Sequence, residues 1–481
     1  MSKIIRTIHP EVVRKTARRC RERGLRIPTF KQLRDPNLIP DSVRAKLKGV
    51  GLWDVNPINL FRICWKNDVG SGLYGRVNYL EIPQAITGVK ARIVGLTGKY
   101  FPTGAHKVGA AFGCLVPRLV SGEFDPEVHK AAWPSTGNFC RGGAFDCAVL
   151  GCTAIAILPE GMSRERFDWL KKIGAHIIAT PGSESNVKEI YDKCRELRQE
   201  PLNIIFNQFE EFGNPIFHYN VTGPALVEVL GELGQERLRP AAFISATGSA
   251  GTIAAGDYLK KQYPGLKVVA TEALQCPTLL ENGFGEHRIE GIGDKHVPWV
   301  HNVRNTDAVA AIDDEDCLRL LRLFNEPAGR DYLARLGVER VERFGCLGIS
   351  GLCNLLGAIK TAKYFELGAK DVVFTVFTDS TELYQSRLEE LRDQRGAYGA
   401  QDAAADWAGP LAHQGVDYFK ELSYPERKAI HNLKYYTWVE QQGKTSQELK
   451  AQWEPEYWRE RFEEEVVYFD QLIEEFNRLA Q

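Results

Sequence analysis

Residues 241–271 read AAFISATGSAGTIAAGDYLKKQYPGLKVVAT and decide the fold class of this chain of 481 residues. The stretch opens with the apolar run 241–245, passes through a turn of small and hydroxyl-bearing residues at 247–252, and follows a helical pattern to residue 262. A second apolar run follows at 267–271. A strand, a helix and a second strand in this order predict two parallel strands joined by a right-handed crossover.

The same alternation extends in both directions, from about residue 90 to residue 390. Most of the predicted strands are continuous apolar runs, as expected for strands that are covered on both faces. The predicted strands are Arg92–Leu96, Ala154–Leu158, His176–Thr180, Asn203–Asn207, Ala241–Ser245, Lys267–Thr271 and Val372–Thr378. The predicted helices include Arg164–Ile173, Asn186–Leu197, Thr252–Gln262 and Leu352–Leu367. The fold class is therefore α/β with parallel sheets, whose binding sites form at the carboxyl ends of strands.

The two ends of the chain differ from this pattern. Residues 1–50 read as a helical arm with Pro-containing loops, and residues 396–481 read as a helical extension rich in Trp, Tyr and charged residues. Aromatic residues spaced along the extension suggest that it packs onto the body of the protein or onto a second subunit. We expect the extension to be a cap without chemistry of its own.

The overall charge is balanced, with 61 Lys and Arg against 62 Asp and Glu, so no net field attracts nucleic acid or an anionic membrane. We therefore expect neither as a partner. The first 35 residues are locally basic, and we interpret them as a solvated helical arm. The basic residues of this arm are Arg14, Lys15, Arg18, Arg19, Arg21 and Arg23.

The cysteine pattern and the lack of targeting signals predict a cytoplasmic protein. The eleven cysteines are an odd number, are scattered along the chain, and contain no C-x-x-C pair. Reduced, mostly buried thiols show this pattern, whereas disulfide frames and zinc sites do not. No signal-peptide core opens the chain, and no run approaches the roughly 18 apolar residues of a membrane span.

A lysine follows the first of three glycine-containing turns that lie between strands and helices. The turn is Phe101-Pro102-Thr103-Gly104-Ala105-His106, and Lys107 stands at the start of the predicted helix Val108–Leu119. Taken alone, such a lysine is most often a solvated surface group. The residues from 108 to 113 are small or apolar, however, and indicate that the amine points into a buried place. A desolvated lysine has a lowered pKa and can attack an aldehyde.

The second turn reads STGNFCRGG over residues 135–143 and precedes the apolar helix 144–150. Exposed amides at a helix N-terminus bind a carboxylate well. The alternative for this segment is a helix cap followed by a flexible loop.

The third turn, 247–252, offers hydroxyls and small residues through which the backbone can approach a phosphate. It is not a nucleotide P-loop, because no Gly-Lys-Ser/Thr follows. Each turn is a weak signal by itself. A buried lysine, a carboxylate-binding loop and a phosphate turn together are what a cofactor bound through a Schiff base requires. We therefore expect pyridoxal 5′-phosphate on Lys107, and no metal.

These residues resemble the pyridoxal-phosphate enzymes of fold type II, the family of tryptophan synthase β, cysteine synthase and cystathionine β-synthase. The resemblance covers roughly residues 55–390. The matching segments are Thr103–Lys107, Pro159–Ser163 with Glu165-Arg166, Gly174-Ala175, Asn214-Pro215 through His218-Tyr219 to Thr222-Gly223-Pro224, Ser245–Thr252, Ile289–Gly293 and Gly348–Gly351. The resemblance implies a catalytic core at 51–395. A smaller movable domain would span about 110–235, and a larger domain 51–109 plus 236–395.

The resemblance also implies roles for individual residues. Lys107 would form the internal aldimine and move the Cα proton, while Asn138 would bond the pyridine hydroxyl. Ser135, Thr136 and Gly137 would hold the substrate carboxylate. The full set expected at the cofactor is His106, Lys107, Asn138, Thr247, Gly248, Ser249, Ala250, Gly251, Thr252, Asp379 and Ser380.

The partner of the pyridine nitrogen stays open between two residues. The alignment places Asp379 where cysteine synthases carry a serine, and a shift by one residue would place Ser380 there. The difference matters, because an aspartate would keep the ring nitrogen protonated and make the ring a stronger electron sink.

Several departures from the family indicate a divergent member with its own substrate. The Asp-Arg pair that follows the lysine in cysteine synthases is Val108-Gly109 here, and Ala250 replaces a glycine of the phosphate turn. The catalytic glutamate of tryptophan synthase β has no counterpart near Ser135, so indole chemistry is not expected. Arg141, if it faces the pocket, would read a second acidic group on the substrate; the alternative is a surface arginine.

We therefore predict β-elimination or β-replacement on an L-amino acid through an aminoacrylate intermediate. The runner-up is a deaminating dehydratase or ammonia-lyase that releases a keto acid. The least favoured alternative is a non-catalytic binding subunit with the same fold. Members of the family are commonly dimers, so the resemblance implies a homodimer.

Overall fold

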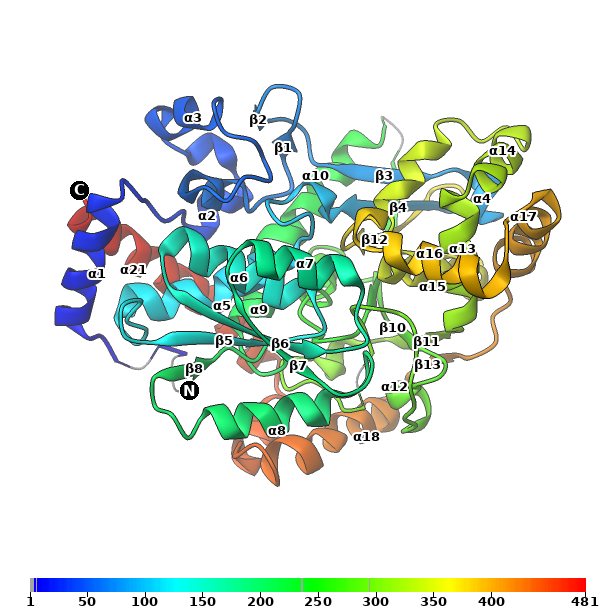
Figure 1. Cartoon of the computed structure of the whole chain (residues 1–481). Helices are drawn as coiled ribbons and strands as arrows, with labels where there is room; N and C mark the ends of the chain where they lie inside the picture. The colour runs from blue at the N-terminus through cyan, green and yellow to red at the C-terminus, as the bar shows by residue number, and fades with distance from the viewer. Residues whose placement is uncertain (1–3, 6, 235–236, 294) are drawn as a thin grey trace.

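The computed structural model describes residues 4–5, 7–234, 237–293 and 295–481 (Figure 1). Its larger sheet has seven strands in the order β13-β11-β10-β9-β12-β4-β3. The bounds in that order are Phe419–Glu421, Ala308–Ile312, Lys267–Ala273, Arg239–Ala246, Asp371–Phe377, Arg92–Thr97 and Tyr79–Ile82. The five central strands are parallel, so their carboxyl ends lie at one edge of the sheet.

The second sheet has four parallel strands in the order β7-β6-β5-β8. Their bounds are His176–Thr180, Thr153–Pro159, Lys130–Pro134 and Asn203–Ile205. A small antiparallel pair is formed by β1 (Asn67–Asp68) and β2 (Leu73–Tyr74). The α/β fold class is thus confirmed.

The expectation of purely parallel sheets needs one correction. Both edge strands of the larger sheet, β3 and β13, run antiparallel to their neighbours β4 and β11. Because β13 belongs to the C-terminal extension, that segment is not helical throughout. Because β3 and β13 are short, these edges are less open to pairing with another chain.

Three helices pack together, the first of them in contact with each of the other two, and small residues let them approach closely. They are α5 (Lys107–Ser121), α6 (Asn138–Leu150) and α9 (Gly213–Phe217). A Cβ atom on Gly113 would lie 2.3 Å from the carbonyl oxygen of Gly213, so only glycine lets α5 and α9 approach this closely. The small residues after Lys107 thus hold the first turn of α5 in place.

The two flanking segments pack together as well as onto the core. The N-terminal helices are α1 (Pro10–Glu22), α2 (Phe30–Arg34) and α3 (Asp41–Leu47), and the chain closes with α21 (Glu465–Leu479). Figure 1 shows α1 and α21 side by side. The carboxylate of Asp470 on α21 accepts hydrogen bonds from the N–H groups of Phe30 (2.6 Å) and Lys31 (3.2 Å).

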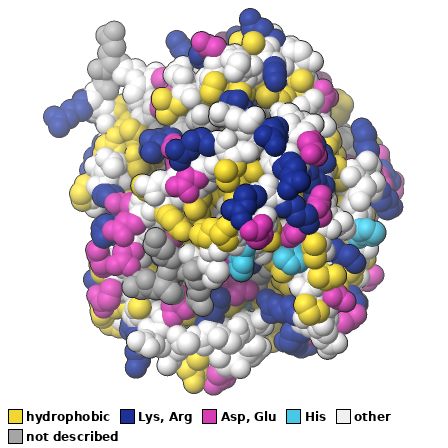
Figure 2. All heavy atoms as spheres, turned by 90° about the vertical axis from the view of Figure 1, so that its left-hand side faces the viewer, with side chains coloured by type: hydrophobic (Ala, Val, Ile, Leu, Met, Phe, Trp, Pro, Cys, Tyr) yellow, Lys and Arg dark blue, Asp and Glu magenta, His cyan; other side chains and the backbone are white. Residues whose placement is uncertain are grey.

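The basic arm is a helix with one packed side and one solvated side. Helix α1 buries Val13 and Ala17 against α5 and α21, whereas Arg14 and Arg18 are exposed. Figure 2 shows Lys and Arg side chains lying among Asp and Glu side chains on this face. Among the helices of the described residues, none is both long and apolar enough to cross a bilayer.

Candidate active site

Lys107 is the first residue of α5, directly beyond the edge where β4 ends. Its Nζ donates a hydrogen bond to Ser249 Oγ at 3.0 Å and lies 3.5 Å from Gln208 Oε1. Burial lowers the pKa of Lys107 to about 8, because the charged amine loses its hydration. The amine lies on the wall of a buried cavity, and its lowered pKa gives it a larger neutral fraction near neutral pH than a solvated lysine has.

The cavity around Lys107 brings together residues from all three predicted turns. Its wall is formed by Lys107, Ser135, Thr136, Asn138, Phe139, Glu184, Gln208, Phe209, Gly248, Ser249, Gly291, Ile292, Gly293 and Thr378. Most of these residues lie in segments that follow strands of both sheets and at the first turns of α5 and α6. The carboxyl ends of β5 and β9 supply the second and third turns, as the α/β topology predicts.

His106 lies behind the lysine in a closed aromatic cluster. Its ring stacks on Trp65, with centroids 5.6 Å apart, and meets the ring of His218 edge-on at 4.9 Å. Its Nε2 lies 3.3 Å from Thr252 Oγ1. Burial lowers the pKa of His106 to about 3, so the ring is neutral at physiological pH. It can orient Thr252, but it is not a source of positive charge.

The second turn bends sharply at a glycine. Gly137 has φ of +143°, and a Cβ there would lie 2.3 Å from the side chain of Arg166, so no larger residue fits. The Gly137 N–H donates to Ser135 Oγ at 3.0 Å. This hydrogen bond orients the start of α6, whose first residue, Asn138, is buried and reaches the cavity.

The third turn leaves a series of backbone N–H groups without partners. Ala250 has φ of +57°, a left-handed conformation that is strained for a residue other than glycine and typical of turns that gather N–H groups around an anion. Among the described residues, the N–H groups from Gly248 to Thr252 donate no hydrogen bond. Such a turn fits a phosphate. Lys107 lies beside the turn, because its amine donates a hydrogen bond to Ser249.

Thr247 differs from the prediction for this turn. Both its N–H (2.8 Å) and its hydroxyl (3.2 Å) donate to the carbonyl oxygen of Thr271 on β10. Its donors are therefore used within the sheet, and the N–H groups that donate no hydrogen bond among the described residues begin at Gly248.

Arg141 also differs from the prediction, because it is neither on the cavity wall nor on the surface. The side chain is buried, donates to the Thr103 carbonyl at 2.8 Å, and lies over the ring of Trp169. It also comes within 3.4 Å of Asn138 Oδ1. The arginine thus connects the lysine turn to the asparagine turn and does not line the cavity.

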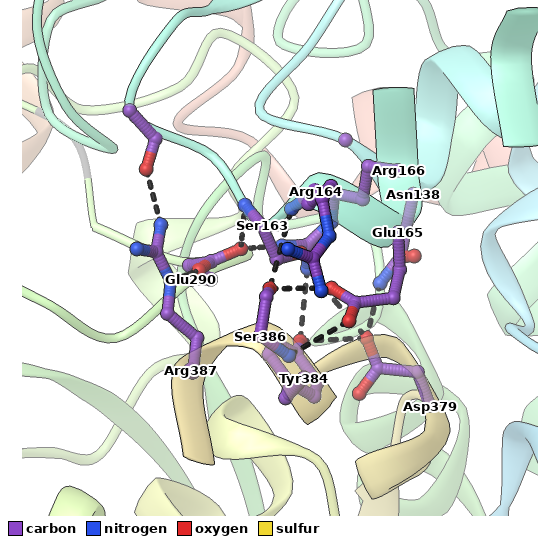
Figure 3. A network of polar contacts seen from close by, with 12 residues as sticks. Asn138, Ser163, Arg164, Glu165, Arg166, Glu290, Asp379, Tyr384, Ser386 and Arg387 are labelled. Atoms are coloured by element: carbon purple, nitrogen blue, oxygen red, sulfur yellow. Dashed lines mark hydrogen bonds and ion pairs between the residues drawn. The ribbon is translucent and has the colours of Figure 1, made fainter. Parts of the chain in front are cut away.

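Strand β12 ends at a buried polar network (Figure 3). Asp379 Oδ2 accepts hydrogen bonds from Asn138 Nδ2 (2.6 Å) and from the Tyr384 hydroxyl (2.8 Å). Burial raises the pKa of Asp379, and the guanidinium of Arg166, whose Nη2 lies 3.8 Å away, acts in the opposite direction. Ser380 is also buried, but its hydroxyl is directed to Glu382 at 3.5 Å.

Arg166 connects this network to the rest of the molecule. Its guanidinium donates to Ser163 Oγ and Tyr384 OH, each at 2.9 Å, and forms an ion pair with the buried Glu290. Glu290 is in turn paired with Arg387 of α16 (Gln385–Arg395) at 2.5 Å. These contacts join α7 (Arg164–Lys172) to the segment that follows β12 (Figure 3).

Four residues of this region were not assigned to the site from the sequence, although two of them follow strands. Gln208 follows β8 and Glu184 follows β7, so the position after a strand was an available signal. Asn214 Nδ2 donates to Ser249 Oγ at 3.0 Å and thereby holds the phosphate turn. Tyr384 becomes visible only in the folded chain, because its partners lie far away in sequence.

Gly251 offers a direct test of the phosphate turn. A Cβ on Gly251 would lie 1.9 Å from Asn214 Oδ1 and would displace the side chain that holds Ser249. We expect Gly251→Ala to weaken cofactor binding at least about tenfold, or ~1.4 kcal/mol. Fluorescence titration of the apoenzyme with the cofactor measures this. Gly265→Ala is the matched control, because nothing lies within 4 Å of its added Cβ; equal weakening in both variants would contradict the assignment.

A comparison with known protein families supports the cofactor that the sequence predicts for this cavity. A family described as pyridoxal-phosphate dependent enzymes matches residues 98–379, which is more than half of the chain. The chain belongs to this family of pyridoxal-phosphate dependent enzymes. This confirms the predicted cofactor and the resemblance to fold type II. Residues 1–97 and 380–481 lie outside the match.

The similar proteins include several cysteine synthases. The cysteine synthase of Staphylococcus aureus is 33% identical over 254 residues, which are 53% of this chain and 74% of that protein. A probable cysteine synthase of Bacillus subtilis is 30% identical over 288 residues, 59% of this chain and 85% of that protein. Among solved structures, O-acetyl serine sulfhydrylase isoform 3 of Entamoeba histolytica shares the fold. Its TM-score is 0.57 at 23% identity, covering 70% of this chain and 93% of that one.

Proposed function

We propose that this chain catalyses β-replacement or β-elimination on an L-amino acid, with pyridoxal 5′-phosphate attached to Lys107. One observation carries the proposal: Lys107, the phosphate turn and the 135–138 turn open into a single cavity. The amine of Lys107 donates a hydrogen bond to Ser249. This residue belongs to the turn whose backbone N–H groups donate no hydrogen bond among the described residues. The cysteine synthases that this chain resembles support the reaction class.

When bound, the cofactor supplies an electron sink that makes a proton on the substrate Cα removable. Gly248 to Thr252 would hold its phosphate through backbone N–H groups, and Asn138 would bond its ring hydroxyl. Ser135, Thr136 and Gly137 would hold the substrate carboxylate. Lys107, freed when the substrate amine takes its place, would remove the Cα proton and later return it. The buried wall excludes water from these atoms.

We further propose that Asp379, and not Ser380, is the group beside the pyridine ring. Its carboxylate contacts Asn138, which we assign to the same ring, whereas the Ser380 hydroxyl is directed to Glu382. Asp379 Oδ1 is buried and has no hydrogen-bond partner among the described residues. An aspartate here would favour a protonated ring nitrogen.

A panel of amino acids tests the proposed reaction. The holoenzyme is incubated with serine, O-acetylserine, cysteine and 2,3-diaminopropionate, with and without sulfide, and the products are identified. A new amino acid in the presence of sulfide would establish replacement. Keto acid and ammonia without a new amino acid would instead establish the deaminating lyase. A cofactor-loaded protein that converts none of them would favour the non-catalytic binding subunit.

The pH dependence of cofactor attachment tests the role of Lys107 separately. The pKa of Lys107 is lowered from 10.5 to about 8, so the neutral amine that attacks an aldehyde becomes the major form above pH 8. We expect the rate of attachment to the apoenzyme to rise with pH and to level off above about 8. Borohydride reduction at timed intervals and mass spectrometry measure this rate. A rate that continues to rise toward pH 10.5 would indicate a solvated lysine.

We also propose the domain division, the assembly and the location of the protein. The four-stranded sheet lies wholly within residues 110–235, which supports a smaller movable domain there and a larger one formed by 51–109 and 236–395. The thiols of Cys20, Cys64, Cys114, Cys140 and Cys147 are buried and free, which supports a reducing, cytoplasmic location. A homodimer with a small amino-acid substrate is the proposed working form.

A further inference from the structure

Glu184 is a buried acid in the cavity of Lys107 to which the proposed reaction assigns no role. It lies in the loop between β7 and α8 (Val187–Leu197), and only 1% of the residue is exposed. It lines the cavity together with Lys107 and Thr136. Among the described residues, neither of its carboxylate oxygens makes a hydrogen bond of ordinary geometry. A buried carboxyl that has only weak contacts, such as those with Thr136 and Gly291, is costly unless a ligand completes its hydrogen bonding.

The surroundings of Glu184 favour its protonated form. Burial raises its pKa to about 8, and this effect outweighs the opposing influence of Arg166, the largest among the groups that lower the pKa. The other groups that lower it are the hydroxyl of Thr136, the N–H of Gly291 and the guanidinium of Arg387. At neutral pH most molecules therefore carry a neutral carboxylic acid in the cavity, which can donate a proton and later accept one.

We propose that Glu184 is a catalytic residue that protonates the leaving group on the substrate Cβ. The inference rests on the proposed function and narrows its substrate class. Acetate leaves as a stable anion, whereas a hydroxyl or amino group needs a proton to leave. An acid at this position therefore indicates an amino acid with a free β-hydroxyl or β-amino group, and serine is the simplest test compound.

The protons balance over a complete cycle. Lys107 takes the proton from Cα, and the electron pair left there forms the double bond to Cβ as the Cβ–O bond breaks. The departing oxygen keeps the bonding pair, takes the proton of Glu184 and leaves as water. In a replacement, the incoming thiol gives its proton to the Glu184 carboxylate as sulfur bonds to Cβ. Lys107 then returns its proton to Cα, so both residues regain their starting forms.

The experiment compares two substrates in the Glu184→Gln holoenzyme. With sulfide as the acceptor, the rate with serine is divided by the rate with O-acetylserine. We expect this ratio to fall roughly 100-fold, since general acid catalysis contributes about 10²–10⁴. Glu184→Asp should restore part of it. Glu160→Gln is the matched control, because Glu160 is an exposed glutamate of the same sheet edge, and its ratio should equal that of the wild type.

A second measurement does not depend on turnover. Infrared spectra of the wild-type holoenzyme from pH 6 to 10 should show a protonated carboxyl that titrates near 8 and is missing in Glu184→Gln. Equal losses with both substrates, or no such titration, would overturn the role of Glu184. A wild type that uses O-acetylserine but not serine would overturn it too, while the proposed function would stand. A cofactor-loaded wild type that uses no amino acid would refute both.

Discussion

Replacing Lys107 with alanine is expected to lower turnover by at least about 10³-fold. The substitution removes both the anchor of the cofactor and the base for the Cα proton, and one positioned acid–base group alone contributes about 10²–10⁴. Borohydride reduction of the wild type should leave the cofactor covalently attached at residue 107, and mass spectrometry of peptides should find no such adduct in Lys107→Ala. The phosphate binding that we propose for the backbone N–H groups of residues 248–252 should persist, although Ser249 loses its hydrogen bond from Lys107.

Lys99→Ala is the matched control for this experiment. Lys99 precedes the same turn, and its amine forms an ion pair with Glu382 at 2.7 Å. Its removal should leave both the adduct and turnover close to those of the wild type. An adduct that persists in Lys107→Ala at another lysine would contradict the assignment.

Arg166→Met is expected to produce the largest loss of stability among the charged residues near the site. The side chain is fully buried and faces the carboxylates of Glu290 and Asp379, so its loss leaves buried acids with less compensation. Breaking a buried ion pair from one side costs about 3–5 kcal/mol. The shift of the denaturation midpoint, followed by tryptophan fluorescence, measures this loss.

Two further variants separate the buried charge from other causes. Arg164 lies two residues away and pairs with Glu389 on the surface, where both side chains are more than half exposed. Arg164→Met should therefore cost only about 0–1 kcal/mol. Adding Glu290→Gln to Arg166→Met should recover part of the loss, because one of the uncompensated acids becomes neutral. Equal losses of stability in Arg164→Met and Arg166→Met would mean that the buried ion pair contributes no more to stability than the surface pair does.

The central fold could be predicted because its signals are local. All seven predicted strands are present, and His176–Thr180 has the bounds that the sequence indicated. β5 and β11 were not predicted, because both are short and rich in alanine, and β5 ends in a proline. The antiparallel strand β13 could not be predicted either, since a three-residue edge strand owes its form to the neighbouring β11.

In the site, too, the features formed by consecutive residues could be predicted, and those that depend on residues distant in sequence could not. The three turns could be recognised because glycine spacing and helix starts are written in consecutive residues. The environment of Arg141 could not, because its partners come from residue 103 and from Trp169. Glu184 was missed for a related reason: nothing in the sequence GSESN distinguishes a buried acid from an exposed one. Burial is a property of the whole fold, and it gives these side chains their chemistry.

The contact between the two ends of the chain has a consequence for how the protein is made. α2 depends on Asp470 for its first hydrogen bonds, and Asn477 Oδ1 accepts from the N–H of Ile27 at 3.1 Å. Phe30 also packs on Phe469, with ring centroids 6.2 Å apart. Because translation runs from the N-terminus to the C-terminus, α2 can complete these contacts only after α21 has been synthesised. During translation the N-terminal arm remains an exposed apolar surface, and that interval is when a chaperone would have most to protect.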